Sequence, residues 1–103
     1  PRSLTERERD LVRFILGRNA PEDLRAEEMN DGGMGSLRFV SGKLDRKFGG
    51  CLGKAQFKDI DGTTVLVAVN SDQDGDLFEL DLWRADFLPV RKIATFENIR
   101  PSD

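Results

Sequence analysis

The first apolar pattern along the chain has the spacing of an amphipathic helix. Four residues recur on one helical face, with charged residues around them: Leu11, Val12, Ile15 and Leu16. Ser3 and Thr5 are both N-cap candidates, since each is followed three residues later by Glu, and Gly17 is a suitable stop. The pattern predicts a helix over about residues 5–17 whose apolar stripe packs across a sheet.

The next segment carries weaker patterns. Pro21, with two acidic residues after it, suits the first turn of a short helix, and residues 24–29 suit an extended piece. A strand is predicted from Ser36 to Val40. Residues 41–50, rich in Gly and basic residues, are expected to form an exposed connection.

Two Asp-Gly pairs, Asp61-Gly62 and Asp74-Gly75, separate three strand-like stretches. Taking the first pair as a two-residue hairpin turn sets three cross-strand pairs: Ile60 with Thr63, Phe57 with Leu66, and Ala55 with Ala68. The strand from Thr63 to Val69 is apolar on both faces, so we expect it near the centre of the sheet.

The third stretch, from Leu77 to Arg84, alternates with period two. Three residues are expected to point to one face: Phe78, Leu80 and Leu82. The opposite face would carry Leu77, Glu79, Asp81 and Trp83. After a break at Pro89, a last strand is expected near 93–96. Together these elements predict one α+β domain over residues 1–103, with an N-terminal helix packed on a mostly antiparallel sheet of four to five strands.

Composition narrows the possible functions. The chain has no His and no Tyr, and its single Cys51 has no neighbour that would activate a thiol. We therefore expect a protein that is not an enzyme and carries no cofactor. A lone cysteine, the absence of a long apolar run and an N-terminus without a signal-like stretch predict a cytoplasmic protein with no membrane contact.

Charge is concentrated in residues 59–86. This segment holds eight carboxylates against the single Arg84, a balance of −7, whereas the whole chain carries −3. Such a field attracts a basic protein and repels nucleic acid, because phosphate contacts dominate nucleic-acid affinity. The candidate partner-binding residues are Asp72, Asp74, Asp76, Glu79, Asp81 and Trp83. Solubility and acid-rich turns are the alternative explanation for the same residues.

Two loops offer a different class of function, the binding of a small molecule or a divalent cation. The residues from Asn70 to Asp81 follow the spacing of a Ca²⁺ loop, but Asn begins it, Asp ends it in place of Glu, and strands flank it. No metal site is therefore assigned. The second loop could cradle an anion with its backbone amides or make a tight connection, and its residues are Asp31, Gly32, Gly33, Gly35 and Ser36. Convergence of Asp31, Glu79 and Asp81 in a cleft would instead indicate an enzyme.

Two blocks resemble a known family. One is Asp-Gly-Gly-Met-Gly-Ser at residues 31–36, and the other is Glu-Leu-Asp-Leu-Trp-Arg-Ala-Asp-Phe at residues 79–87. They are similar to blocks of a family of small bacterial domains of unknown function. The resemblance implies a short accessory protein of the kind found beside bacterial toxins or mobile elements. With the acidic segment, it favours an immunity or antitoxin-like protein that binds a basic toxin.

Overall fold

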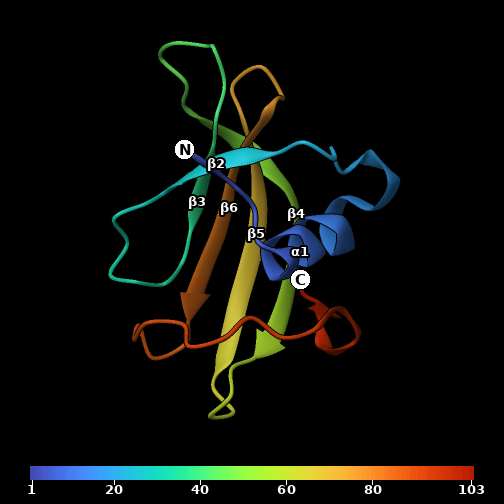
Figure 1. The fold of residues 1–103 in the computed structure, drawn as a ribbon, viewed down its shortest axis with the longest axis vertical. Helices are drawn as coiled ribbons and strands as arrows, with labels where there is room; N and C mark the ends of the chain where they lie inside the picture. The colour runs from blue at the N-terminus through green and yellow to red at the C-terminus, as the bar shows by residue number, and fades with distance from the viewer.

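The computed structural model describes all 103 residues, as a seven-stranded antiparallel sheet with one α-helix on one face (Figure 1). The helices are α1 (Glu6–Leu16) and two short 3-10 helices, η1 (Gly17–Asn19) and η2 (Phe96–Asn98). The strands are β1 (Arg2–Ser3), β2 (Arg25–Glu28), β3 (Leu37–Phe39), β4 (Phe48–Lys58), β5 (Thr64–Asp72), β6 (Leu77–Arg84) and β7 (Arg100–Pro101). Their order in the sheet is β1-β2-β3-β6-β5-β4-β7, with β5 and its neighbours at the centre.

The α+β class is confirmed, but the expectation of four to five strands was wrong. The two edge strands β1 and β7 have two residues each, too few to show an alternating pattern in sequence. The strand expected near 93–96 is also absent. Residues Val90, Ile93 and Ala94 pack against the core as irregular chain, which explains their apolar character without a strand.

Of the two N-cap candidates, Thr5 begins α1. Its Oγ1 accepts from the Glu8 amide at 3.2 Å, and the Glu8 carboxylate accepts from the Thr5 amide at 2.8 Å. The same carboxylate pairs with Arg2 at 2.8 Å, which ties β1 to the helix. α1 lies across β4 and β5, where Gly53 faces Ile15 so closely that a Cβ at Gly53 would lie 2.6 Å from Ile15 Cγ2.

The β4–β5 register differs by one residue from the prediction. Phe57 lies opposite Val65, not Leu66, and Ala55 lies opposite Val67, not Ala68. The reason is a three-residue loop: the Asp59 amide donates to the Thr63 carbonyl at 2.9 Å, and Gly62 has a positive φ of 86°. The shift exchanges the two faces of β5. Val65 and Val67 face the core beside Phe57 and Ala55, in place of Leu66 and Ala68.

β4 is also longer than expected. It begins at Phe48 and so includes the end of the segment 41–50 that was expected to be an exposed connection. Two register shifts interrupt its pairing with β5, between Phe48 and Gly50 and between Cys51 and Gly53. The extended piece predicted at residues 24–29 is confirmed as β2, whereas the helical turn lies earlier, at η1.

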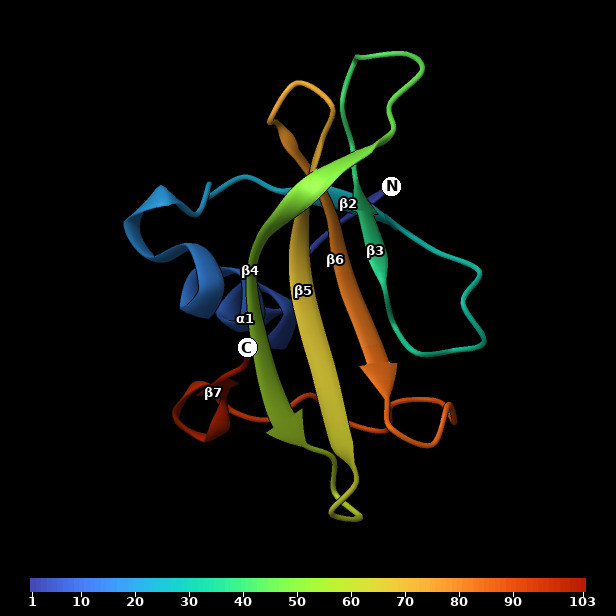
Figure 2. The ribbon, with the colours of Figure 1, turned by 180° about the vertical axis from the view of Figure 1, so that it is seen from behind.

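Helix α1 and the segment after β6 both lie on one side of the sheet (Figure 1). Figure 2 shows the other side, with the strands in front and α1 behind them. We call this the open face. Alternation from the buried core residues places these side chains on it: Lys54, Gln56, Lys58, Leu66, Ala68, Glu79, Asp81 and Trp83. No helix of the structure is both long and apolar enough to cross a membrane.

Candidate functional site

One end of the sheet holds a buried cation, which we call the Arg84 cluster. Arg84, with its side chain 2% exposed, donates through Nη1 to Asp59 Oδ2 at 3.0 Å and through Nη2 to Asp61 Oδ2 at 2.8 Å. Asp86 accepts from Nε at 3.0 Å and from Nη2 at 2.7 Å. The Thr63 hydroxyl accepts from Nη2 at 3.0 Å. Three of the eight carboxylates of the acidic segment therefore surround its single arginine.

The surroundings of the Arg84 cluster lower the pKa values of its carboxyl groups. The Thr63 amide and the Arg84 guanidinium lower the pKa of Asp61 to about 2. Burial alone would raise the pKa of Asp59, but the amides of Arg91 and other residues, together with Arg84, lower it. All three carboxylates are thus ionised at neutral pH and engaged within the fold.

The opposite end of the sheet holds a buried anion, which we call the Asp72 cluster. The Asp72 carboxylate, with 0% of its side chain exposed, accepts from Lys43 Nζ at 2.8 Å and from Arg46 Nε at 2.9 Å. Its other oxygen accepts from the amides of Asp74 and Asp76 at 2.9 and 3.0 Å. These hydrogen bonds, with that from Lys43 the strongest, hold the pKa of Asp72 well below its usual range.

Three carboxylates from the segment with Ca²⁺-loop spacing surround an ammonium group. Lys43 Nζ lies 2.8 Å from Asp72, 2.8 Å from Asp74 and 2.9 Å from Asp76. The turn-forming Asp and Gly residues at this spacing therefore serve a hairpin turn closed by a lysine from the preceding loop. No set of three or more acidic or thiol side chains forms an arrangement that could hold a metal ion.

The loop formed by residues 31–36, which we call the glycine loop, also directs its backbone donors inward. The Asp31 carboxylate accepts from the Met34 amide at 3.1 Å and from the Ser36 amide at 2.9 Å. Partial burial would raise the pKa of Asp31, but these hydrogen bonds lower it. Two of the amides that could have cradled an outside anion are thus occupied by the loop's own carboxylate.

Ser36 connects this loop to β6. Its hydroxyl accepts from the Leu82 amide at 2.9 Å and lies 3.0 Å from Asp81 Oδ1. The regular pairing of β3 with β6 covers only Leu37 and Arg38, so the Ser36 side chain continues the contact where the ladder stops. Asp31, Ser36 and Asp81 therefore lie beside one another, although 50 residues separate the first from the last.

Asp81 differs from the other carboxylates of the acidic segment. It alone has no Lys or Arg partner, since Glu79 pairs with Arg38 at 2.9 Å and the remaining six belong to the two clusters. Burial, followed by the charges of Glu79 and Asp31, raises the pKa of Asp81. Trp83 lies two residues along the same face and is partly exposed. The open face thus presents one unneutralised carboxylate beside an aromatic ring.

The start of β6 departs from simple alternation. The pairing with β5 shifts between Asn70 and Ser71, and this extra residue in β6 changes the side-chain directions. Leu77 therefore packs against the core with Leu80 and Leu82, whereas strict alternation predicted it on the opposite face. Phe78 is outside the core cluster and lies between two guanidinium groups, 4.7 Å from Arg38 and 4.9 Å from Arg46.

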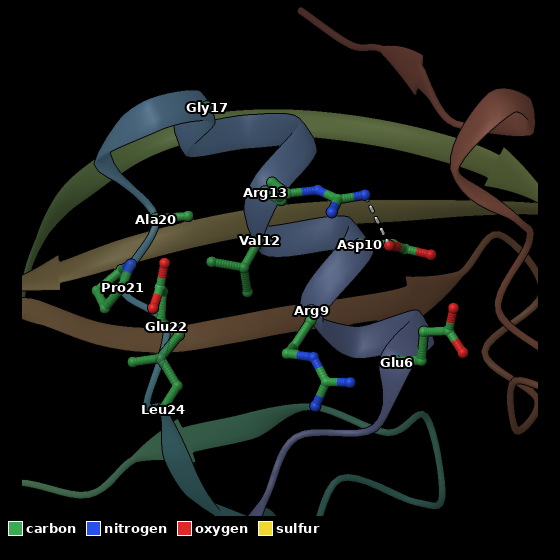
Figure 3. Close-up of a pocket in the computed structure, with 10 residues that line it drawn as sticks. All are labelled: Glu6, Arg9, Asp10, Val12, Arg13, Gly17, Ala20, Pro21, Glu22 and Leu24. Carbon is green, nitrogen blue, oxygen red and sulfur yellow. Dashed lines mark hydrogen bonds and ion pairs between the residues drawn. The ribbon is translucent and has the colours of Figure 1, made fainter.

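A large cavity lies elsewhere, between α1 and the chain that leads to β2 (Figure 3). It has a volume of about 550 Å³ and is lined by residues of both charges, including Glu6, Arg9 and Glu22. Its Asp10 pairs with Arg13 at 3.1 Å, the contact drawn as a dashed line. Asp81 and Trp83 line neither this cavity nor four others of the molecule.

The cations were the residues that sequence reasoning missed. The charge count placed Arg84 among the acids but gave it no partners, and it treated Lys43 and Arg46 as parts of an exposed connection. Arg46 is 8% exposed and also donates to the carbonyls of Phe39 and Leu77 at 3.1 and 2.6 Å. No local signal marks Lys43 or Arg46 as a buried partner, because the carboxylate that both of them bind lies 26 or more positions away in the sequence.

Comparison with known proteins supports the resemblance at the level of the family. No curated protein matches the chain, and no solved structure does so either. One family model, described as "Domain of unknown function (DUF6984)", matches residues 1–94. The match spans the helix, the strands from β1 to β6 and both charged clusters, and the chain therefore belongs to this family of domains of unknown function.

Proposed function

We propose that the chain is a protein-binding domain that uses the open face, around Asp81 and Trp83, to bind a partner with a basic surface. The observation that carries the proposal is Asp81, the one carboxylate of the acidic segment without a cation partner, held beside Trp83 on an uncovered sheet. A partner's Lys or Arg would supply the missing charge, and the ring would supply apolar contact area.

The proposal narrows the acidic surface that the sequence suggested. Asp72, Asp74 and Asp76 already share Lys43, so they contribute less to an outside partner than Glu79 and Asp81. Across the sheet from β6, the open face becomes basic at Lys54 and Lys58. The fitting partner surface is therefore basic opposite β6 and apolar opposite Trp83.

An immunity or antitoxin-like role in a bacterial cytoplasm is the biological setting that we propose for this surface. An acidic strip imitates the phosphate charge that a nuclease toxin binds, and it accelerates encounter with a basic protein. No observation favours either loop as a second site, because Lys43 and Asp31 occupy the groups that a ligand would need.

The test is capture of the partner through the open face. Three forms of the full chain carry a photo-crosslinking amino acid at Gln56: the wild type, Asp81→Lys and Glu22→Lys. Each is exposed to lysate of the source organism. Glu22 is exposed and unpaired, and its reversal makes the same charge change away from the face. We expect one partner to be captured by the wild type and Glu22→Lys but not by Asp81→Lys. Equal capture by all three proteins would refute the proposal.

A further inference from the structure

A second cavity lies at the end of the sheet near the Asp59–Thr63 loop, away from Asp81. It has a volume of about 480 Å³ and is lined by Arg7, Lys58, Ile60, Lys92, Ile93, Ala94, Thr95, Asn98 and Arg100. Four of these nine residues are cations and none is acidic. We propose that this cavity binds a small organic anion that carries a phosphate group.

Four separate elements bring the cations together. Arg7 comes from α1, Lys58 from the end of β4, Lys92 from the irregular segment after β6, and Arg100 from β7. The fold fixes two of these positions directly. The Lys92 amide donates to Asp59 Oδ1 at 3.0 Å, and Arg100 pairs with Gln56 of β4. The convergence is therefore a product of tertiary structure rather than of a run of basic sequence.

The cations of this cavity lack the carboxylates that neutralise cations elsewhere in the molecule. Lys58 Nζ donates only to the Thr64 hydroxyl, at 2.6 Å, and the Lys92 side chain has no partner. Arg100 Nη1 donates only to main-chain carbonyls, those of Glu97 at 2.6 Å and Ile99 at 3.1 Å.

Arg7 is the one cation of the cavity with acidic neighbours, and both lie outside the lining. Its Nη1 is 3.8 Å from Asp10, which makes a closer contact of 3.1 Å with Arg13. The pKa of Glu97 is lowered mainly by hydrogen bonds from its own amide and from Thr95, and to a smaller extent by the positive charge of Arg7. The lining of the cavity therefore carries an excess of positive charge, whereas the whole chain has a net charge of −3.

This excess and the cavity's shape together define the ligand class. A concave site lined by one sign of charge concentrates oppositely charged ligands, and guanidinium groups match phosphate oxygens in geometry. The volume lies within the range of small-molecule sites, roughly 300–1,000 Å³. Ile60, Ile93 and Ala94 add apolar surface, and Ile60 is 68% exposed. A phosphate group joined to a flat or apolar moiety fits this lining better than phosphate alone.

The experiment is a titration of the full ¹⁵N-labelled chain, followed by ¹H–¹⁵N correlation spectra in low salt. The probes are inorganic phosphate, adenosine 5′-monophosphate and adenosine. We expect the nucleotide to shift amides of residues 58–60 and 92–100, to bind more tightly than inorganic phosphate, and to weaken as salt is added. Adenosine, which lacks the charge, is expected to leave these amides unchanged.

Two double variants with the same change of charge separate the cavity from general electrostatics. Lys58→Gln with Lys92→Gln is expected to weaken nucleotide binding by about tenfold or more, since charged hydrogen bonds are lost. Lys47→Gln with Lys54→Gln removes two exposed lysines outside the cavity and should leave the affinity within about twofold.

Three results would overturn the proposal: no shift of these amides by millimolar nucleotide, equal affinity for nucleotide and inorganic phosphate, or equal weakening by both double variants. If the cavity variant fails to fold, the wild-type spectra still decide, because they locate the shifted amides directly. Asp81 and Trp83, which carry the proposed protein-binding face, take no part in the cavity, and only Lys58 belongs to both, so the titration and the capture experiment can fail separately.

Discussion

The two ends of the sheet each bury one charged side chain, and the two charges have opposite signs. In the Arg84 cluster a cation is surrounded by three carboxylates and a hydroxyl. In the Asp72 cluster an anion is surrounded by two cations and two amides. No buried side-chain nitrogen or oxygen in the protein, in these clusters or elsewhere, lacks a hydrogen-bond partner.

The difference lies in where the partners come from. The carboxylates around Arg84 come from the β4–β5 loop and from the residues just after β6, all within the acidic segment. The cations at Asp72 come from the loop before β4, about 30 residues earlier. The Arg84 cluster therefore joins two neighbouring turns and the C-terminal segment, whereas the Asp72 cluster holds the loop before β4 in place. We expect loss of the first to damage the fold more than loss of the second.

The largest expected effect is that of Arg84→Met. Removal of the guanidinium leaves Asp59, which is 3% exposed, without its cation, and an unpaired buried charge is strongly destabilising. We expect the melting temperature to fall by roughly 15 °C. Thermal unfolding followed by circular dichroism measures the change.

Arg84→Lys is the matched control for this variant. It keeps the charge, but a single ammonium nitrogen cannot reproduce the fork of the guanidinium, which donates through Nε, Nη1 and Nη2. Its melting temperature should therefore lie between those of the wild type and Arg84→Met. A fall of less than about 3 °C in Arg84→Met would show that the buried pairs contribute little, and the contrast between the two ends of the sheet would disappear.

A smaller effect is expected from Asp72→Asn. The amide oxygen can still accept from the Asp74 and Asp76 amides. Arg46, however, loses its charged acceptor, and Lys43 keeps only the exposed carboxylates of Asp74 and Asp76. We expect a fall in melting temperature of about 8 °C at pH 7. Faster amide exchange should be confined to residues 40–47. Asp74→Asn, which changes an exposed carboxylate bound by the same lysine, should have an effect of less than about 2 °C.

Acid should reduce the difference between the wild type and Asp72→Asn. The pKa of Asp72 is lower in the folded protein than in the unfolded chain, so the ionised group stabilises the fold above pH 4. This contribution declines as the pH falls from about 4 towards 2, because the unfolded chain then takes up the proton first. Melting temperatures of the two proteins should therefore converge over that range. A constant difference would show that Asp72 acts through shape and not through charge.

Much of the fold could be predicted because the relevant signals are local. The capping spacing at Thr5 and the apolar stripe of α1 located the helix to within one residue at each end. The alternation of β6 placed Leu80 and Leu82 on one face, and both are buried. Such patterns depend on neighbouring residues and are therefore visible in one sequence.

The errors arose where geometry depends on a turn or on a distant partner. An Asp-Gly pair suits loops of two or three residues, and the choice of two displaced the β4–β5 register by one. In the candidate site, the charge count located the acidic segment but could not show which carboxylates are paired within the fold. Lys43 and Arg46 are remote from Asp72 in sequence, so only the folded chain shows that Asp81 is the one carboxylate of the segment without a cation partner.

The smallest expected effect, opposite in sign, is that of Asp81→Asn. The pKa of Asp81 is raised in the folded protein, because burial and the charges of Glu79 and Asp31 oppose its ionisation. A group of this kind stabilises the fold below its unfolded pKa and loses that contribution as the pH rises through its folded pKa. Asn removes the charge and can still bond Ser36, so we expect the melting temperature at pH 7 to rise by about 1–2 °C.

Asp81→Asn should also separate stability from binding. The gain in melting temperature should vanish near pH 3, where the carboxyl is protonated in both states. Capture of the partner should weaken, although the fold is intact, because the neutral amide no longer attracts a basic surface. A fall in melting temperature similar to that of Asp72→Asn would place Asp81 with the structural carboxylates. Asp81 would then join the two clusters, and the open face would lose the one acidic group that distinguishes it from them.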